Sequence, residues 1–189
     1  MHPINQIQME LPQFRYSPNA YKIDVFEDTD GTCSVCNQQR NIKYNSSFYS
    51  EEEPVYICPW CVADGSAAQK YDGVFNDPEG VETPLGYDSD ETLQSTFDEK
   101  AEEVSQRTPS YISWQQEVWL SHCNEPCAFI GYADSKAIKP ILHELETDIE
   151  KAGYDSNLIT EHMSKEGSVV GYLFQCLHCG IHRLHVDSD

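Results

Sequence analysis

The sequence contains few basic residues. Its 189 residues include 12 lysines and arginines against 32 aspartates and glutamates, which gives a formal net charge of −20 at pH 7. Surfaces that bind nucleic acids carry positive charge, and an anionic membrane would repel a protein of this sign. We therefore exclude direct nucleic-acid binding. The charge favours solubility, and it would also speed the encounter with a basic protein partner.

Long apolar runs are absent too, because no stretch approaches the roughly 18 apolar residues of a membrane span. The first residues, MHPINQIQMELPQF, lack the basic start and apolar core of a secretory signal. We therefore expect a cytoplasmic protein without membrane insertion, in a compartment where structural disulfides are rare. Hydrophobic residues make up 39% of the chain. That suffices for a hydrophobic core, but each half alone would be small enough to need a covalent cross-link or a metal site for stability.

The sequence also has no isolated cysteine, because all 8 cysteines fall into close pairs. Tetrahedral Zn²⁺ binds thiolates at about 2.3 Å, and two tight turns can direct four sulfurs into one volume. A disulfide within so short a loop would constrain the unfolded chain little. We predict two Zn²⁺ ions, one held by Cys33, Cys36, Cys58 and Cys61, the other by Cys123, Cys127, Cys176 and Cys179.

The CPWC motif at Cys58 and Cys61 leaves a redox alternative open. It is similar to the active-site motif of thioredoxin-like oxidoreductases. Such a site uses one thiol pair inside a βαβ frame, whereas here a second C-x2-C pair lies upstream and no parallel βαβ pattern surrounds it. The paired motifs therefore favour metal binding.

Residues 1–75 are predicted to form the first zinc module. Strands are expected over residues 41–49 and 54–57, and the second cysteine pair is expected to open a helix, although Gly65 disfavours it. A helix N-terminus would stabilise thiolate charge. The order of knuckle, hairpin and ligand-bearing helix looks like a treble-clef finger. A zinc ribbon is the alternative, if a strand follows Cys61.

Residues 76–107 are predicted to form an acidic connector. Its first half is rich in proline and glycine and reads as a loop, whereas residues 92–107 favour a helix with Leu93, Phe97 and Val104 as its apolar stripe. The carboxylates form either a solvated helix face or a docking surface for a basic partner.

Residues 108–189 are predicted to form a second zinc module, a zinc ribbon opened by a helical insertion. Apolar residues at three-to-four spacing indicate a helix over 135–153, with Pro140 in its first turn. The last segment reads as strand, cysteine knuckle, strand. The whole chain is thus predicted to be α+β, with two zinc-stabilised modules packed together.

Histidines crowd the second set of cysteines. Four thiolates already complete a closed tetrahedral shell, so we expect these histidines on the surface or in hairpins. In the alternative, His122 or His182 replaces a cysteine ligand, and an open catalytic position becomes conceivable.

An aromatic stretch, TPSYISWQQEVWLSHC, precedes Cys123. Thr108 or Ser113 could cap a helix there. We expect Tyr111, Trp114 and Trp119 to pack around the second zinc, because aromatic residues dominate cores. The alternative is a contact surface or a small-ligand pocket.

Several motifs together resemble the bacterial CbrC-like proteins. The likeness covers residues 11–187 and rests on YSEEEPVYICPWCVADGSAAQKYD, RTPSYISWQQEVWLSHC, CAFIGYA and YLFQCLHCGIHRLHVDSD. The resemblance implies a link to colicin tolerance and a role as an immunity partner in bacterial toxin systems. It implies no catalytic residue, and it carries over the cysteine pairs as zinc ligands.

The leading hypothesis is therefore a zinc-stabilised acidic protein that sequesters a basic toxin domain, for example a nuclease. We expect no catalytic residues, because the predicted metal sites are closed. Two alternatives remain: a zinc-dependent enzyme with an open metal position, and a stress adaptor that responds to oxidation or zinc.

Overall fold

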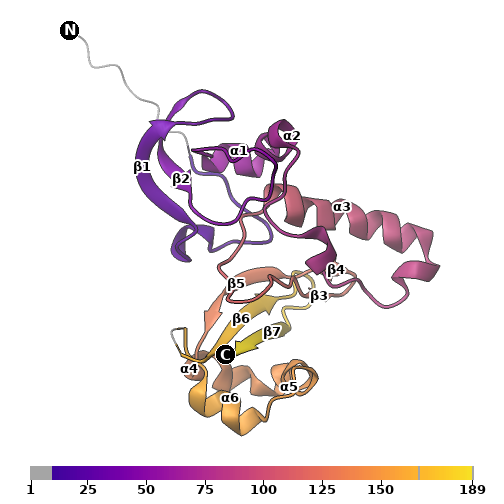
Figure 1. Ribbon diagram of the computed structural model, residues 1–189. Coiled ribbons are helices and arrows are strands. Elements are labelled where there is room, and N and C mark those ends of the chain that lie inside the picture. The colour runs from indigo at the N-terminus through magenta and orange to yellow at the C-terminus, as the bar shows by residue number, and fades with distance from the viewer. Residues whose placement is uncertain (1–9, 166, 189) are drawn as a thin grey trace.

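The computed structural model describes residues 10–165 and 167–188, so that residues 1–9, 166 and 189 of the predicted modules lie outside it. The protein is a mixed α+β structure, as predicted. A β-hairpin and two short helices form one end, and a three-stranded sheet backed by helices forms the other (Figure 1). Within the described residues, no helix combines the length and apolar character needed to cross a bilayer.

The N-terminal end is built on one antiparallel hairpin. Strand β1 (Phe26–Thr32) follows the short turn η1 (Ala20–Lys22) and pairs with β2 (Gln39–Tyr44). The sequence indicated a strand near β2 but not β1, whose acidic sequence FEDTDGT disfavours a strand until the partner strand supplies the pairing. The prediction of a strand over residues 54–57 is wrong. That stretch is an extended loop whose carbonyls accept hydrogen bonds from Ser34 and Tyr44.

The second cysteine pair opens a helix, as predicted. Helix α1 (Pro59–Ala63) ends at a break, and α2 (Ser66–Tyr71) follows. Gly65 lies between them with φ of +75°, a left-handed conformation that a helix cannot continue through. The expected helix is therefore two short ones.

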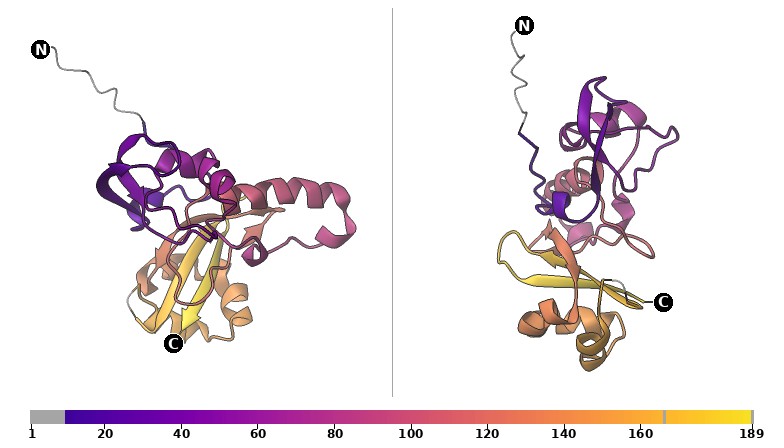
Figure 2. Two further views of the ribbon diagram at one scale, coloured as in Figure 1. Left: turned by 45° about the horizontal axis from the view of Figure 1, so that its top comes forward. Right: turned by 90° about the vertical axis from the view of Figure 1, so that its left-hand side faces the viewer.

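Helix α3 (Glu91–Arg107) confirms the helix predicted in the acidic connector. The Asp90 carboxylate caps it by accepting from the backbone N–H groups of Thr92 and Leu93, both at 3.0 Å. Phe97 and Val104 are buried on one side. The N-terminal end of α3, preceded by the turns η2 (Pro78–Gly80) and η3 (Tyr87–Ser89), projects outward from the rest of the molecule (Figures 1 and 2).

The C-terminal end is an antiparallel sheet in the order β5-β6-β7. The strands predicted around the last cysteine pair are confirmed as β6 and β7. A small hairpin, β3 and β4, precedes the sheet. The bounds are β3 (Ser121–His122), β4 (Glu125–Pro126), β5 (Ala128–Ala133), β6 (Val169–Gln175) and β7 (His182–Ser188).

Three helices back this sheet, as the side view shows (Figure 2). They are α4 (Ser135–Ile138), α5 (Leu142–Lys151) and α6 (Ser156–His162), with the turn η4 (Lys139–Ile141) between the first two. The helix predicted over 135–153 is therefore interrupted, and Pro140 lies in the interruption because it has no N–H to continue the helical ladder.

The aromatic stretch before Cys123 does not form the predicted helix. Residues 108–120, all of which the structure describes, run as a loop. The Tyr111 hydroxyl holds it by donating to the Val118 carbonyl at 2.8 Å and accepting from the Val118 N–H at 2.9 Å. Tyr111 and Trp119 are buried, as expected, but Trp114 is 47% exposed.

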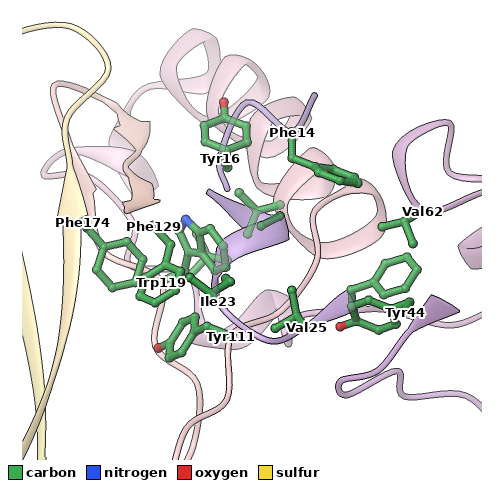
Figure 3. Close-up of a cluster of buried hydrophobic side chains, with 14 of the residues drawn as sticks. Phe14, Tyr16, Ile23, Val25, Tyr44, Val62, Tyr111, Trp119, Phe129 and Phe174 are labelled. Carbon is green, nitrogen blue, oxygen red and sulfur yellow. The ribbon is translucent and has the colours of Figure 1, made fainter. Parts of the chain in front are cut away.

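The largest core draws on all three predicted segments. Tyr44 and Val62 come from the first, and Trp119, Phe129 and Phe174 from the last (Figure 3). Phe97 and Val104 of α3 join the same cluster. The boundaries proposed at residues 75 and 107 stay predictions. Buried side chains of all three segments nevertheless contact one another in a single hydrophobic core.

Candidate metal centres

The first centre brings together the four predicted ligands Cys33, Cys36, Cys58 and Cys61. Their sulfurs all lie within 4.8 Å of one another. The Cys33 and Cys61 sulfurs are 3.8 Å apart, and those of Cys36 and Cys58 are 4.0 Å apart. A tetrahedron with Zn–S bonds of about 2.3 Å has sulfurs about 3.8 Å apart. The geometry therefore fits one tetrahedral metal ion.

Local turns position these sulfurs. The first pair lies in a knuckle between β1 and β2, closed by the Asn37 N–H donating to the Cys33 carbonyl at 2.9 Å, with Asn37 at φ +58°. Cys58 is the N-cap of α1 and Pro59 its first residue. The second pair therefore lies at a helix N-terminus, where unpaired N–H groups favour negative sulfur.

The first centre is buried, and its charges need a cation. Cys33, Cys58 and Cys61 are at most 2% exposed. Hydrogen bonds with Cys58 and Cys61 lower the pKa of Cys33, and the hydrogen bond between Cys33 and Cys61 raises the pKa of Cys61. Four sulfurs so close together cannot all ionise against one another, and a divalent metal ion removes this conflict.

Arg40 supplies further positive charge beside the first centre. Its guanidinium carbon lies 4.5 Å from the centroid of the Trp60 ring. Burial opposes the charge, but hydrogen bonds to Cys58 and Cys36 outweigh it and raise the pKa of Arg40. Arg40 thus stabilises the thiolate form of the centre. It lies close to Cys36 in the sequence, but the spacing alone does not reveal that its side chain turns back toward the sulfurs.

The second centre joins three cysteines and one histidine: His122, Cys123, Cys176 and Cys179. Their ligand atoms lie within 4.8 Å of one another. The Cys123 and Cys179 sulfurs are 3.8 Å apart, and the His122 Nδ1 lies 3.2 Å and 3.3 Å from them. Three thiolates and one imidazole form a complete set for a closed tetrahedral zinc site.

Cys127 is not part of the second centre, which corrects its prediction as a ligand. The chain reverses at Cys123 and Asn124, whose φ values are +51° and +59°. This turn places His122 and Cys123 at the tip of the β3–β4 hairpin and Cys127 at its base. Cys127 is fully buried in the aromatic core, its carbonyl accepts from Trp119 Nε1 at 2.8 Å, and burial raises the pKa of its thiol to about 12.

The other histidines of this region contact carboxylates or rings. His182 Nδ1 lies 2.9 Å from the Glu144 carboxylate of α5. The His185 ring stacks on Tyr172, with centroids 5.6 Å apart. Neither belongs to the cluster of ligand atoms, so the alternative in which a histidine replaces a cysteine applies to His122 and not to His182.

Glu125 braces the second centre from inside the protein. It lies on the ligand-bearing hairpin, is 1% exposed, and accepts hydrogen bonds from Lys100 at 2.9 Å, from Tyr16 at 3.0 Å and from Arg15. His178, from the knuckle between Cys176 and Cys179, lies 2.6 Å from the same carboxylate. Burial acts to raise the pKa of Glu125, but these contacts outweigh it and lower the pKa.

The two centres differ in exposure. Cys123 and Cys179 are exposed at the protein surface, whereas three of the four ligands of the first centre are buried. Leu177 and Ile181, next to the second centre, are also about two-fifths exposed, at 42% and 40%. Both donor sets provide four ligands, so neither geometry reserves the open position that a catalytic zinc uses.

Comparison with known proteins places nearly the whole chain in one family. The sequence model of an uncharacterised protein family, UPF0167, matches residues 11–188. UPF0167 proteins of Mycobacterium bovis and Mycobacterium tuberculosis are each 36% identical to the chain over 185 residues, which cover 94% of both chains in each comparison.

A UPF0167 protein of Pseudomonas aeruginosa is also 36% identical over 185 residues, which cover 95% of this chain and 97% of that protein. No solved structure matches the chain. The names of these relatives do not include CbrC, and the resemblance to CbrC-like proteins is compatible with them. The chain belongs to the UPF0167 family.

Proposed function

We propose that this chain is an acidic binding protein, stabilised by two structural Zn²⁺ ions, that captures a basic protein partner. The observation that carries the proposal is the charge of residues 79–102. Seven carboxylates are exposed there: Glu79, Asp88, Asp90, Glu91, Asp98, Glu99 and Glu102. We refer to them as the acidic face.

The acidic face has no internal neutralisation. Its only basic residue, Lys100, donates to the buried Glu125 and therefore does not offset the exposed carboxylates. Most of the face lies on α3 and the turn before it, the part of the molecule that projects outward (Figure 1). A charged, accessible surface of one sign steers an oppositely charged partner and raises its association rate.

The metal centres fit a structural role in this proposal. Both donor sets are closed, and Zn²⁺ is the metal that such thiolate and imidazole sets select. Structural zinc contributes about 10–16 kcal/mol to small domains, comparable to the whole net stability of a domain. The helix that begins at Pro59, with Cys58 as its N-cap, favours the treble-clef class for the first centre over a zinc ribbon.

The partner that fits best is a basic toxin domain, such as a nuclease, which makes the chain an immunity-type protein. Nuclease surfaces that face phosphate are positively charged. The acidic face is complementary to such a surface and could occupy it in place of nucleic acid. The resemblance to CbrC-like proteins supports the same partner class. We assign no catalytic step to the chain, because no open metal position supports one.

Charge-neutral variants test this function. The triple variant Glu91→Gln, Glu99→Gln, Glu102→Gln removes three charges from the acidic face. The matched control, Glu146→Gln, Glu150→Gln, Glu161→Gln, removes three exposed charges from α5 and α6. Binding to the toxin encoded beside this gene, and protection of cells that express it, should fall with the first variant only. The proposal is wrong if no neighbouring toxin is bound or neutralised and basic proteins fail to associate at moderate salt.

The exposure of Cys123 and Cys179 favours a second candidate function, an adaptor that responds to oxidants by releasing zinc. Mild hydrogen peroxide should then release one Zn²⁺ per chain and abolish partner binding. Retention of both ions, or binding that survives their release, would exclude this function without affecting the first.

A further inference from the structure

A surface pocket of about 500 Å³ lies where the two ends of the molecule meet. One wall is formed by the chain that leaves β2, including Ser46 and Ser47, and by Val55. The other is formed by the aromatic loop, including Ile112 and Glu117. The pocket belongs to neither metal centre, and cavities at such junctions are common binding sites.

Glu117 places a carboxylate in this pocket without a basic partner. Its oxygens accept from the Tyr49 hydroxyl at 3.2 Å and from the Ser47 hydroxyl at 3.4 Å. It forms no ion pair with any residue that the structure describes. The one lysine in the lining, Lys43, lies 3.7 Å from Glu27 instead. Glu117 is therefore available to a cation from outside the chain.

Exposed apolar side chains line or adjoin the same pocket. Val55 is 83% exposed and Ile112 51%, and both line it. Tyr49 is 49% exposed and adjoins the pocket through the contact of its hydroxyl with Glu117. These are three of the seven large apolar side chains exposed in the described residues. Gathered apolar side chains with a polar rim mark interaction sites, and aromatic residues supply much of the binding energy of such sites.

The pocket lies close to the start of the segment that carries the acidic face. Gln116, next to Glu117, donates to the Asp77 carboxylate at 3.2 Å, and the Trp119 N–H donates to the Gly80 carbonyl at 2.9 Å. The aromatic loop thus lies against the start of the acidic segment. The three exposed glutamates at 51–53 directly precede Pro54, which lines the pocket together with Val55. A ligand in the pocket would therefore be held within negative surroundings.

We propose that this pocket receives an arginine side chain of the basic partner, with an apolar neighbour of that arginine packed on Val55 and Ile112. The assignment of this arginine to a protein partner rests on the proposed function. A guanidinium pairs with a carboxylate through two parallel hydrogen bonds and also stacks on aromatic rings. The carboxylate of Glu117 allows the first interaction, and the exposed ring of Tyr49 allows the second.

The test uses a short probe, acetyl-Leu-Arg-amide, and its neutral counterpart with citrulline in place of arginine. Titration of the zinc-loaded chain, followed by ¹⁵N–¹H NMR, should shift the amides of residues 46–47 and 112–117. The arginine probe should bind about tenfold more tightly than the citrulline probe, because only the guanidinium carries charge.

The Glu117→Gln variant should abolish that preference. It keeps an oxygen that can accept from Ser47 and Tyr49, and unchanged zinc content and melting temperature would verify the fold. The control Glu146→Gln, exposed on α5 and outside both the pocket lining and the acidic face, should bind both probes as the parent does. Equal affinity for the two probes, or shifts on α3 without shifts in the pocket, would overturn the proposal.

The probe needs no toxin, so the two proposals fail separately. If the arginine preference is absent but toxin is still neutralised, the pocket assignment is wrong and the function stands. If the preference is present but no basic protein binds, the pocket is correct as an arginine site and the function is wrong.

Discussion

The Nδ1 atom of His122 lies 3.3 Å from the sulfur of Cys179, in the place that the sequence pattern reserves for Cys127. The β3–β4 hairpin produces this exchange, because its two-residue turn carries His122 and Cys123 to the tip and leaves Cys127 in the core. The ligand set of the second centre is therefore set by a turn conformation and not by the cysteine count.

Metal content distinguishes the two assignments. His122→Ala should reduce bound zinc from two ions to one per chain, because it removes a ligand of the second centre. Cys127→Ala should retain both ions and lower stability by only about 1 kcal/mol, since it deletes one small buried group. Elemental analysis of the purified, untagged variants measures both. Loss of one ion from Cys127→Ala would contradict this ligand set.

Arg40 should affect the affinity of the first centre without being a ligand. Its guanidinium contacts the thiolates and lies over Trp60, so Arg40→Met removes the charge while keeping an apolar stem. Loss of such an outer partner lowers metal affinity about 10–100-fold. Competition with a chromophoric chelator gives the value. Lys43→Met, on the same strand, is the control for charge alone, and an equal effect in both variants would refute a specific role.

Local patterns predicted the parts of the fold that depend on neighbouring residues. The stripe of Leu93, Phe97 and Val104 predicted α3, and the spacing around Cys176 and Cys179 predicted the last two strands. The four ligands of the first centre also followed from spacing, because each C-x2-C pair forms its own tight turn.

Features that depend on pairing with another segment or on an unusual backbone conformation were not predictable. Strand β1 exists because β2 pairs with it, although its own composition opposes a strand. The buried Glu125 has no local signal, since its partners Arg15 and His178 are remote in sequence. The replacement of Cys127 by His122 requires a left-handed backbone conformation at Cys123. Cysteine rarely adopts this conformation, so the sequence gives no indication of it.

A buried ion pair between α5 and β7 should be a weak point for stability. Asp148 and Arg183 are joined by two hydrogen bonds, of 2.7 Å and 2.9 Å, and are 7% and 13% exposed. Asp148→Asn removes one of the two carboxylates that pair with Arg183 and leaves Glu82, at 3.1 Å, as the other, which should cost about 2 kcal/mol. Urea unfolding should show a lower midpoint with an unchanged slope. Glu150→Gln, exposed on the same helix, should stay within about 0.5 kcal/mol of the parent.

His185 should make stability depend on pH. Burial lowers its pKa below the ordinary value of 6.5 and outweighs the Asp187 carboxylate, whose Oδ1 lies 3.1 Å from Nε2. The unfolded chain therefore binds a proton at a higher pH than the folded one does. The contribution of His185 to stability is complete above pH 6.5 and declines as the pH falls from there towards the lowered pKa.

The variant His185→Phe isolates this contribution, because it keeps a ring against Tyr172 and cannot be protonated. With zinc in excess, the free energy of unfolding of the parent should drop between pH 7.5 and pH 5.5 by more than that of the variant. The exposed His143 provides the control, since His143→Gln should show the same pH dependence as the parent. An identical drop in all three proteins would mean that the lowered pKa of His185 does not contribute, and that the acid sensitivity arises elsewhere in the chain.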